Sequence, residues 1–326
     1  MRVLKNANIP FVKIRYYAYA VSIILILAGL GGLIVNGLNW SIDFTSGVAA
    51  KVNLKAKDTS VAPLKIDKLR SILKSNGYPE AEIQFVGPEE DATFMIKIKS
   101  KTSASAVSSD TKTQILEIIQ TNLSDYIKGK DLGKDVIEEI YEVGPKVGGE
   151  LRTAAGFAIL ISLLLMIVYI WFRFEFTFGV MAIVALFHDV FIIVGIFALT
   201  GKEVTVQIIA ALLTIVGYSI NDTIVIFDRI REDLKIYRKE PVAEVFNRSI
   251  NQTLTRTIIT AGTTLLTALA LYFFGGSVLH DFAFAMCLGI IFGTYSSIFV
   301  ASNLVIDINA ITHKEKQTMQ HLTKRK

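Results

Sequence analysis

Cysteine and charge are both scarce in this sequence, and each scarcity excludes a class of protein. Cys287 is the only cysteine in the 326 residues, so no disulfide can form within the chain. Charged residues make up 19% of the sequence, whereas soluble proteins carry about a quarter. Because the missing charge leaves long apolar segments, the composition is typical of a membrane protein and excludes an ordinary soluble domain.

The sequence also lacks the motifs of the common enzyme classes. It has no G-x-x-x-x-G-K-[ST] loop, so hydrolysis of a nucleotide would have to come from a partner. His188-Asp189 lacks the second histidine of a zinc-protease motif, and the run from Gly217 to Asn221 lacks the final glycine of a nucleophile elbow. The segment 39–153 contains no ligand set with metal-binding spacing. We therefore expect no enzyme, no cofactor and no metal.

The sequence does have six long apolar stretches. A helix needs roughly 20 residues to cross a membrane, and each stretch is close to that length. They lie at 16–38, 154–172, 176–199, 204–227, 257–274 and 282–306. The first follows a basic arm, 1–15, and has no small-x-small cleavage site, so we interpret it as an uncleaved anchor. The predicted fold class is a polytopic α-helical membrane protein with six transmembrane helices.

Lysine and arginine are distributed unequally between the two sides of these spans. Seventeen of them flank the spans on one side, against Lys202 alone in the short loops opposite. Since basic flanks stay in the cytoplasm, both termini are expected there, including a basic tail, 307–326, that contacts anionic lipid. The connection 228–256 is predicted to be a cytoplasmic amphipathic helix interrupted near Pro241. This distribution explains the net charge of +5 and argues against a nucleic-acid partner.

The long segment 39–153 is almost neutral and is expected to lie outside as a domain of its own. Alternating apolar residues predict strands beginning near Val48, at Glu82–Val86 and at Phe94, and a last strand at Val136–Val143. Apolar residues at helical spacing predict one helix after the first strand and another before the last. The order β-α-β-β-α-β is the ferredoxin-like arrangement, so we predict an inserted small α+β external domain. A holding or pushing role and a merely structural role both remain open.

Asp222 is the most informative single residue, because it lies within an apolar span. A charged group at membrane depth costs about 2.5–3.5 kcal/mol even on the mildest scales, and such a residue usually marks function. A carboxylate whose access to water changes could take up and release a proton, and Arg256 could pair with its ionised form. The alternatives are a static packing role for Asp222 and an interfacial anchoring role for Arg256. His188-Asp189 is either a proton relay or a neutral hydrogen-bonded pair.

Four motifs together resemble the SecD/SecF family of protein-export membrane proteins, which belongs to the resistance-nodulation-division superfamily. The motifs are Gly217–Glu232, Phe187-His-Asp-Val190, Ser249–Thr257 and Ile42–Gly47. The match covers nearly the whole chain in its order of anchor, external domain and five further spans. The family usually has glycine where Ser46 stands.

The resemblance implies a six-span half-transporter that pairs with SecD in the bacterial cytoplasmic membrane. The implied pair uses the proton motive force to complete export of unfolded preproteins, working with the SecYEG channel and with YajC and YidC. The residues that the motifs assign to proton coupling are Asp222, Arg256, Asn221, His188 and Asp189. The motif positions expected to be structural are Asp43, Gly47, Gly217, Asp228 and Arg229.

Two other functions are compatible with the same features. A half-size proton-coupled exporter of small molecules or lipids would have similar ionisable residues within its spans, although a second six-span half is missing. A structural membrane scaffold would tolerate the loss of the Asp222 charge. The sequence does not distinguish H⁺ from Na⁺ as the coupling ion.

Overall fold

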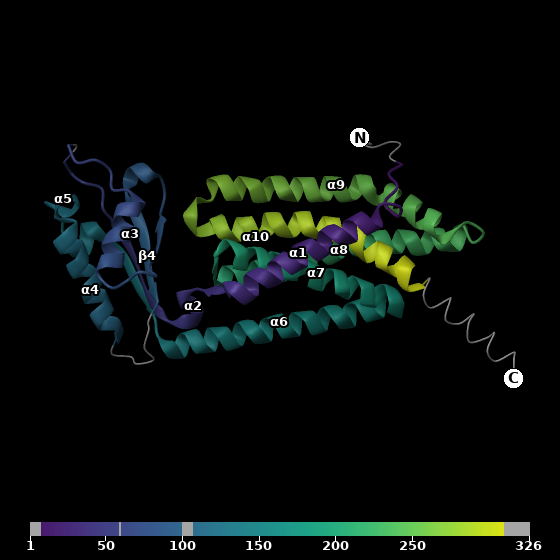
Figure 1. Cartoon of the computed structure of the whole chain (residues 1–326), viewed down its shortest axis with the longest axis horizontal. Helices are drawn as coiled ribbons and strands as arrows, with labels where there is room; N and C mark the ends of the chain where they lie inside the picture. The colour runs from purple at the N-terminus through teal and green to yellow at the C-terminus, as the bar shows by residue number, and fades with distance from the viewer. Residues whose placement is uncertain (1–7, 59, 100–106, 310–326) are drawn as a thin grey trace.

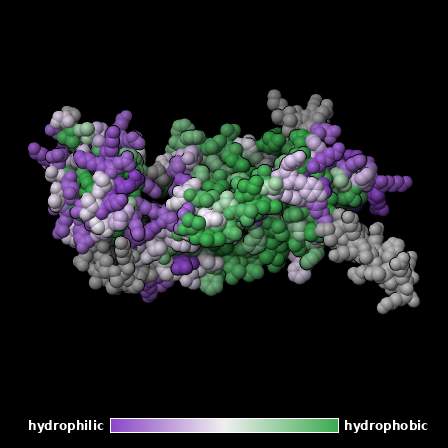
Figure 2. All heavy atoms as spheres, viewed as in Figure 1, coloured by the Kyte–Doolittle hydropathy of each residue, from purple (hydrophilic) through white to green (hydrophobic). Residues whose placement is uncertain are grey.

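The computed structural model describes residues 8–58, 60–99 and 107–309, and it consists of a helical bundle with a separate α+β domain at one end (Figure 1). Six helices of the described chain are long and apolar enough to cross a membrane. Hydrophobic side chains cover the surface of the bundle, whereas hydrophilic side chains cover the α+β domain and the opposite end of the molecule (Figure 2). This banding is what a protein that spans a membrane requires.

The bundle is formed by long helices that are joined by short connections. They are α1 (Arg15–Val35), α6 (Pro145–Arg173), α7 (Phe176–Thr200), α8 (Val206–Ile236), α9 (Val242–Phe274) and α10 (Gly276–Tyr295), which continues through a π-helical segment, η3 (Ser296–Ala301). The last span runs from Val278 to Asn309 in all. In Figure 1, α9 and α10 lie together along one edge, α6 lies along the opposite edge, and α1 crosses between them.

Several helices are longer than the apolar stretches predicted. The expected amphipathic connection 228–256 is not a separate helix, because α8 continues to Ile236, α9 begins at Val242, and only 237–241 separates them. Helix α6 begins at Pro145 rather than at 154, since a proline is well suited to the first turn of a helix. Hydropathy locates the apolar core of a span but not the polar turns that extend it. The far end of the basic tail, from 310, lies outside the described residues.

Helices α1 and α7 cross in unusually close contact. A Cβ atom on Gly29 would lie 3.0 Å from the Cα of Gly195, and a Cβ on Gly195 would lie 2.5 Å from the Cα of Gly29. Only glycine on both helices allows this separation, as in other close membrane helix pairs. The crossing holds α1 against the centre of the bundle.

The α+β domain has one four-stranded antiparallel sheet with the strand order β3-β4-β2-β5. Its elements are β2 (Gly47–Asn53), α3 (Ile66–Ser75), β3 (Glu82–Phe85), η1 (Glu89–Asp91), β4 (Thr93–Lys99), α4 (Val107–Asn122), α5 (Ser124–Ile127), η2 (Leu132–Val136) and β5 (Ile137–Val143). Fully buried Val52, Phe94, Leu69 and Ile119 bring sheet and helices into one apolar core. The domain therefore has a core separate from that of the bundle.

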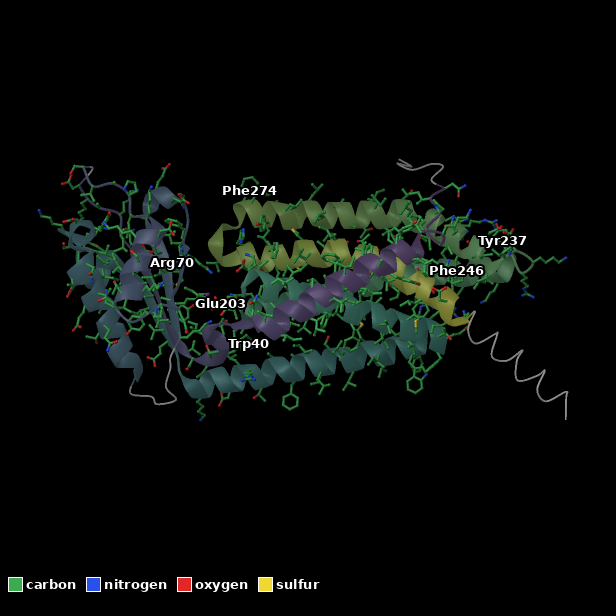
Figure 3. All side chains as sticks on the ribbon, in the orientation of Figure 1. Trp40, Arg70, Glu203, Tyr237, Phe246 and Phe274 are labelled. Atoms are coloured by element: carbon green, nitrogen blue, oxygen red, sulfur yellow. The ribbon has the colours of Figure 1, made fainter. Side chains whose placement is uncertain are left out.

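A short second sheet connects the domain to the bundle. Strand β1 (Asn39–Trp40), which follows α1, pairs in parallel with β6 (Glu203–Val204), which precedes α8. Figure 3 labels Trp40 and Glu203 at this junction. A short helix, α2 (Ile42–Thr45), leads from β1 into β2. The chain thus enters the domain through α1 and leaves it through α6, while β6 links it sideways to α8.

Two residues of the Ile42–Gly47 motif have clear structural roles at the junction. The backbone N–H of Val206 donates a hydrogen bond to Oδ2 of Asp43 at 3.2 Å, so Asp43 caps the first turn of α8. A Cβ on Gly47 would lie 2.3 Å from the carbonyl oxygen of Ile98, which excludes any larger residue there. Both residues therefore fix how the domain meets the bundle.

Candidate functional site

Asp222 lies in the middle third of α8 and is only 4% exposed. Its Oδ2 atom is buried and has no hydrogen-bond partner within the described part of the chain. A buried carboxylate oxygen without a partner is unfavourable when the group is ionised. The site therefore has a place for a proton or for a donor that this chain does not supply.

Arg256 lies on the neighbouring helix, α9, and its charge acts on Asp222 through space. Its side chain is exposed on the surface of the bundle, and among the described residues it forms no ion pair with Asp222. The two groups are therefore within electrostatic reach but not bonded. Asp222 and Arg256 thus lie on adjacent helices, α8 and α9, but their side chains do not form an ion pair in this structure.

Polar groups next to this pair also face outward from the bundle. Helix α8 exposes Asn221 and Gly217, and a Cβ on Gly217 would meet nothing within 4 Å. Four further exposed polar residues on α8 and α9 are Gln207, Thr214, Thr263 and Thr267. Exposed polar groups at membrane depth are rare and usually face a protein partner or water. The α8–α9 face is therefore the open side of the site.

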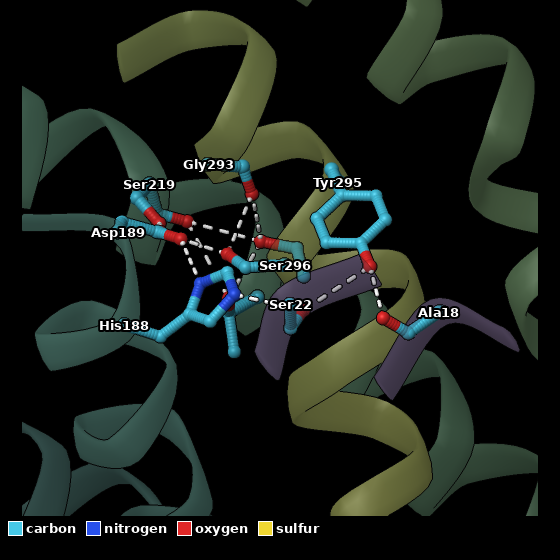
Figure 4. A network of polar contacts seen from close by, with 10 residues as sticks. Ala18, Ser22, His188, Asp189, Ser219, Gly293, Tyr295 and Ser296 are labelled. Atoms are coloured by element: carbon cyan, nitrogen blue, oxygen red, sulfur yellow. Dashed lines mark hydrogen bonds and ion pairs between the residues drawn. The ribbon is translucent and has the colours of Figure 1, made fainter. Parts of the chain in front are cut away.

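His188 and Asp189 form a second, fully enclosed cluster on α7 (Figure 4). The imidazole Nδ1 lies 2.9 Å from Oδ1 of Asp189, and its Nε2 lies 2.9 Å from the hydroxyl of Ser22 on α1. The other carboxylate oxygen, Oδ2, accepts hydrogen bonds from Ser219 on α8 at 2.6 Å and from Ser296 at 2.7 Å. The sequence pointed to the histidine and the carboxylate but not to Ser22 or Ser219, because a lone serine in an apolar helix gives no signal.

The two charged motif residues that follow Asp222 on α8 pair at the end of the bundle opposite the α+β domain. Asp228 forms an ion pair with Arg173 of α6. Arg229 pairs with Glu232 at 2.8 Å and with the buried Asp233 at 3.0 Å. These contacts explain both residues as boundary charges, and they lie apart from Asp222.

A third polar cluster, not anticipated from the sequence, lies at the junction of domain and bundle. The ammonium of Lys97 on β4 lies 2.6 Å from Oε2 of Glu203, whose side chain is 3% exposed. Burial raises the pKa of Glu203 to about 7, against the opposing charge of Lys97. The same ion pair raises the pKa of Lys97 although burial alone would lower it. This contact is a titratable link between the two parts of the molecule.

A cavity of about 100 Å³ lies beside this ion pair. It is lined by residues of both parts of the molecule, among them Asp43, Gln84, Tyr141, Gln207 and Asp281. Within the described ranges, no three histidine, cysteine or carboxylate side chains are placed to hold a metal ion. The cavity is therefore a space of mixed polar and apolar lining at the N-terminal end of α8.

Comparison with known proteins agrees with the motifs. The family described as protein export membrane protein SecD/SecF, C-terminal, matches residues 123–310. The protein translocase subunit SecF of Desulfurispirillum indicum is 44% identical over 93% of this chain and 92% of its own length. The SecF subunit of Rhodothermus marinus is 41% identical over 95% of this chain and 96% of its own length.

A solved structure has the same fold. The crystal structure of SecDF from Thermus thermophilus, titled a translocon-associated membrane protein, superposes with a TM-score of 0.77 at 40% identity. The superposition covers 95% of this chain but 40% of the SecDF chain. This chain therefore corresponds to one part of a longer, fused relative.

Proposed function

Since the chain belongs to the SecD/SecF family of protein-export membrane proteins, we propose that it is the translocase subunit that works beside SecD and uses the proton motive force to complete export. Its role as a multi-pass subunit of the protein translocase follows from relatives that match it over almost their full length. The observation that carries the energetic part of the proposal is the partnerless buried oxygen of Asp222 beside the charge of Arg256.

Proton coupling at Asp222 follows from the cost of each charge state. Ionised Asp222 leaves a buried oxygen unsatisfied unless Arg256 moves towards it, whereas protonated Asp222 has no net charge to satisfy. Protonation therefore favours separation of α8 and α9 side chains, and loss of the proton favours their pairing. One proton crossing the membrane supplies about 2.3 kcal/mol per 100 mV, which is enough to shift such a pair. Asn221, exposed beside Asp222, is placed to line the path by which water reaches it.

SecD is the partner that covers the open α8–α9 face. In the fused relative, both proteins form one chain, and this chain corresponds to 40% of it. The outward-facing Arg256, Asn221 and Gly217 need a partner or water at membrane depth, and a second six-span half provides both. The proposed further partners are SecYEG, YajC, YidC and the unfolded preprotein.

The proposed topology places the α+β domain outside the bacterial cytoplasmic membrane and both termini in the cytoplasm. It retains the division into an arm 1–15, a first span 16–38, an external domain 39–153, a five-helix bundle 154–306 and a tail 307–326, with 228–256 on the cytoplasmic side as the end of α8, the turn 237–241 and the start of α9. We assign the ferredoxin-like arrangement to the domain. It is supported by the βαββαβ order and the strand order β3-β4-β2-β5.

The test is export of a preprotein into inverted membrane vesicles with and without a proton gradient. Asp222→Asn is expected to abolish the stimulation by the gradient while the complex with SecD still co-purifies. Asp228→Asn is the matched control, because it removes a carboxylate from the same helix at its paired boundary. Full gradient stimulation in the Asp222→Asn vesicles would refute proton coupling at this residue. Loss of stimulation on replacing Na⁺, with the proton gradient intact, would identify Na⁺ as the coupling ion.

A further inference from the structure

The enclosed cluster around His188 and Asp189 joins four helical segments by six polar contacts. Besides the four contacts of His188 and Asp189 given above, the hydroxyl of Ser22 lies 3.1 Å from that of Tyr295. The Tyr295 hydroxyl donates to the carbonyl oxygen of Ala18 at 2.6 Å. The contacts thus run without interruption from α1 through the imidazole to the carboxylate, and on to α8 and α10 (Figure 4).

A count of hydrogens shows that these contacts need one more proton than the neutral histidine and the hydroxyls supply. Each of the six contacts requires one hydrogen between its two heavy atoms. Ser22, Ser219, Ser296 and Tyr295 each bring one, and a neutral imidazole brings one, which makes five. Ser296 could turn to the carbonyl of Gly293 at 3.1 Å instead, but its contact with Asp189 is the shorter. A sixth hydrogen completes the network only if the His188–Asp189 pair holds an additional proton.

The location of the missing hydrogen follows from the strengths of the contacts. In the discharged state, the Asp189 carboxylate retains the Nδ1–H of His188 because a charge-assisted hydrogen bond is the strongest available. The imidazole Nε2 is then an acceptor and takes the hydrogen of Ser22. The Ser22–Tyr295 contact is left with two oxygens and no hydrogen, unless Tyr295 turns from Ala18. In either case, α1 loses one bond to the rest of the bundle.

Charge favours the complete network as well. With the additional proton, the His188–Asp189 pair is neutral overall, either as imidazolium and carboxylate or as two neutral groups. Without it, the pair has a net negative charge at 7% and 1% exposure, where an uncompensated charge is costly. On the surrounding elements, α1 carries Tyr19, which donates to Asp307 at 3.0 Å, α8 carries Asp222 in its middle third, and α10 carries Tyr295. The cations Arg15 of α1 and Arg229 of α8 are each paired with a carboxylate of their own, Asp307 and Asp233, and so do not balance the charge of the His188–Asp189 pair.

The backbone beside the cluster is irregular, which is an independent observation. Helix α10 changes to π-helical geometry at Ser296, the residue that donates to Asp189. Such π-helical turns inside longer helices are frequent at functional sites. At such a turn the backbone can also adopt a second hydrogen-bonding pattern, so a side-chain contact there can shift.

We propose that His188 and Asp189 form a proton-binding site distinct from Asp222, and that its proton locks α1 to the rest of the bundle. Loading completes the path from Asp189 through Ser22 to Tyr295, and discharge opens the α1 end of that path. Because α1 continues into β1 and the external domain, the site controls how firmly the entry of that domain is held. The inference does not depend on proton coupling at Asp222.

The test is hydrogen–deuterium exchange of the full chain in lipid nanodiscs, read around Ser22 and corrected for the intrinsic dependence of exchange on pH. In the unmodified protein, exchange is expected to be roughly fivefold faster once the site discharges at alkaline pH, the ratio for one hydrogen bond of about 1 kcal/mol. Arg15 at the start of α1 pairs with Asp307 at 3.1 Å, and exchange at this end of the helix is read separately.

Three variants distinguish the possible outcomes. Asp189→Asn is expected to give slow exchange at every pH, because an amide N–H supplies the sixth hydrogen permanently. Ser22→Ala, which leaves the His188–Asp189 contact intact, is expected to give fast exchange at every pH. Asp222→Asn is expected to retain the pH dependence of the unmodified protein. The proposal is overturned by any of three results. Exchange around Ser22 is independent of pH in the unmodified protein, its pH dependence is unchanged in Asp189→Asn, or its pH dependence is abolished in Asp222→Asn.

Discussion

Glu203→Gln provides a direct test of the junction between the α+β domain and the bundle. Burial raises the pKa of Glu203 from 4.5 to about 7, and a shift of this size corresponds to roughly 3 kcal/mol of preference for the protonated form. Because the pKa in the folded state is above the unfolded value, the stabilising contribution is complete below pH 4.5. It is lost as the pH rises to about 7. Glutamine stays neutral, so the variant should lose this dependence on pH.

Tryptophan emission can report the change, since Trp40 lies on β1 directly beside β6. The chain has two tryptophans, and Trp171→Phe leaves Trp40 as the single reporter. In this background, thermal unfolding of the chain in nanodiscs is measured between pH 4 and 9. The melting temperature is expected to fall between pH 4.5 and about 7 with Glu203 present, and to be nearly level over that range in Glu203→Gln.

The control is Glu80→Gln, which neutralises an exposed carboxylate of the same domain and should leave the pH profile unchanged. Lys97 remains charged throughout this range. The loss of its partner in Glu203→Gln therefore changes the melting temperature by a similar amount at every pH and does not change the slope of melting temperature against pH. If the slope persists in Glu203→Gln, a group other than Glu203 is titrating. That result would refute the assignment of the pH dependence to burial of Glu203.

Three further substitutions test how the junction and bundle are held together. Ser46 has φ 73° and ψ 155°, a conformation that costs a residue other than glycine about 1–3 kcal/mol. Ser46→Gly should therefore raise the melting temperature. An unchanged or lower melting temperature would show that the turn is unstrained. Asp43→Ala removes the acceptor of the Val206 N–H at the first turn of α8 but leaves the Thr205 cap, and it should cost about 1 kcal/mol of stability, whereas Asp43→Asn should retain most of it in the same melt. Gly195→Ala places a methyl group 2.5 Å from the Cα of Gly29, so it should force α1 and α7 apart and reduce cross-linking between them; unchanged cross-linking would contradict the close crossing.

The membrane part of the fold follows largely from hydropathy, because long apolar stretches have few alternatives to spanning helices. Asp222 and His188-Asp189 could also be found in the sequence, since charge is conspicuous against an apolar background. The ends of the helices could not, because the amphipathic residues after 228 fit a surface helix and a continued span equally well. The structure shows the second arrangement, with α8 ending at Ile236.

Contacts between distant segments were beyond the reach of pattern analysis for a physical reason. Lys97 and Glu203 are separated by 106 positions, and neither stands out among ordinary surface charges. Ser22 and Ser219 are equally unremarkable until their helices bring the two hydroxyls to one imidazole–carboxylate pair. Periodicity reveals which face of a helix is apolar, but it does not reveal which neighbour that face meets.

The pairing of β1 with β6 restricts how force can pass through this molecule. The four-stranded sheet of the α+β domain is backed by its own apolar core, which favours movement of the domain as a unit. The β1–β6 pair at its base spans two residues on each strand, and the Lys97–Glu203 and Asp43–Val206 contacts cross the same junction. Any movement of the α+β domain relative to the bundle is therefore expected to bend the chain at the β1–β6 pair. A covalent cross-link between positions 39 and 203 would then prevent that movement.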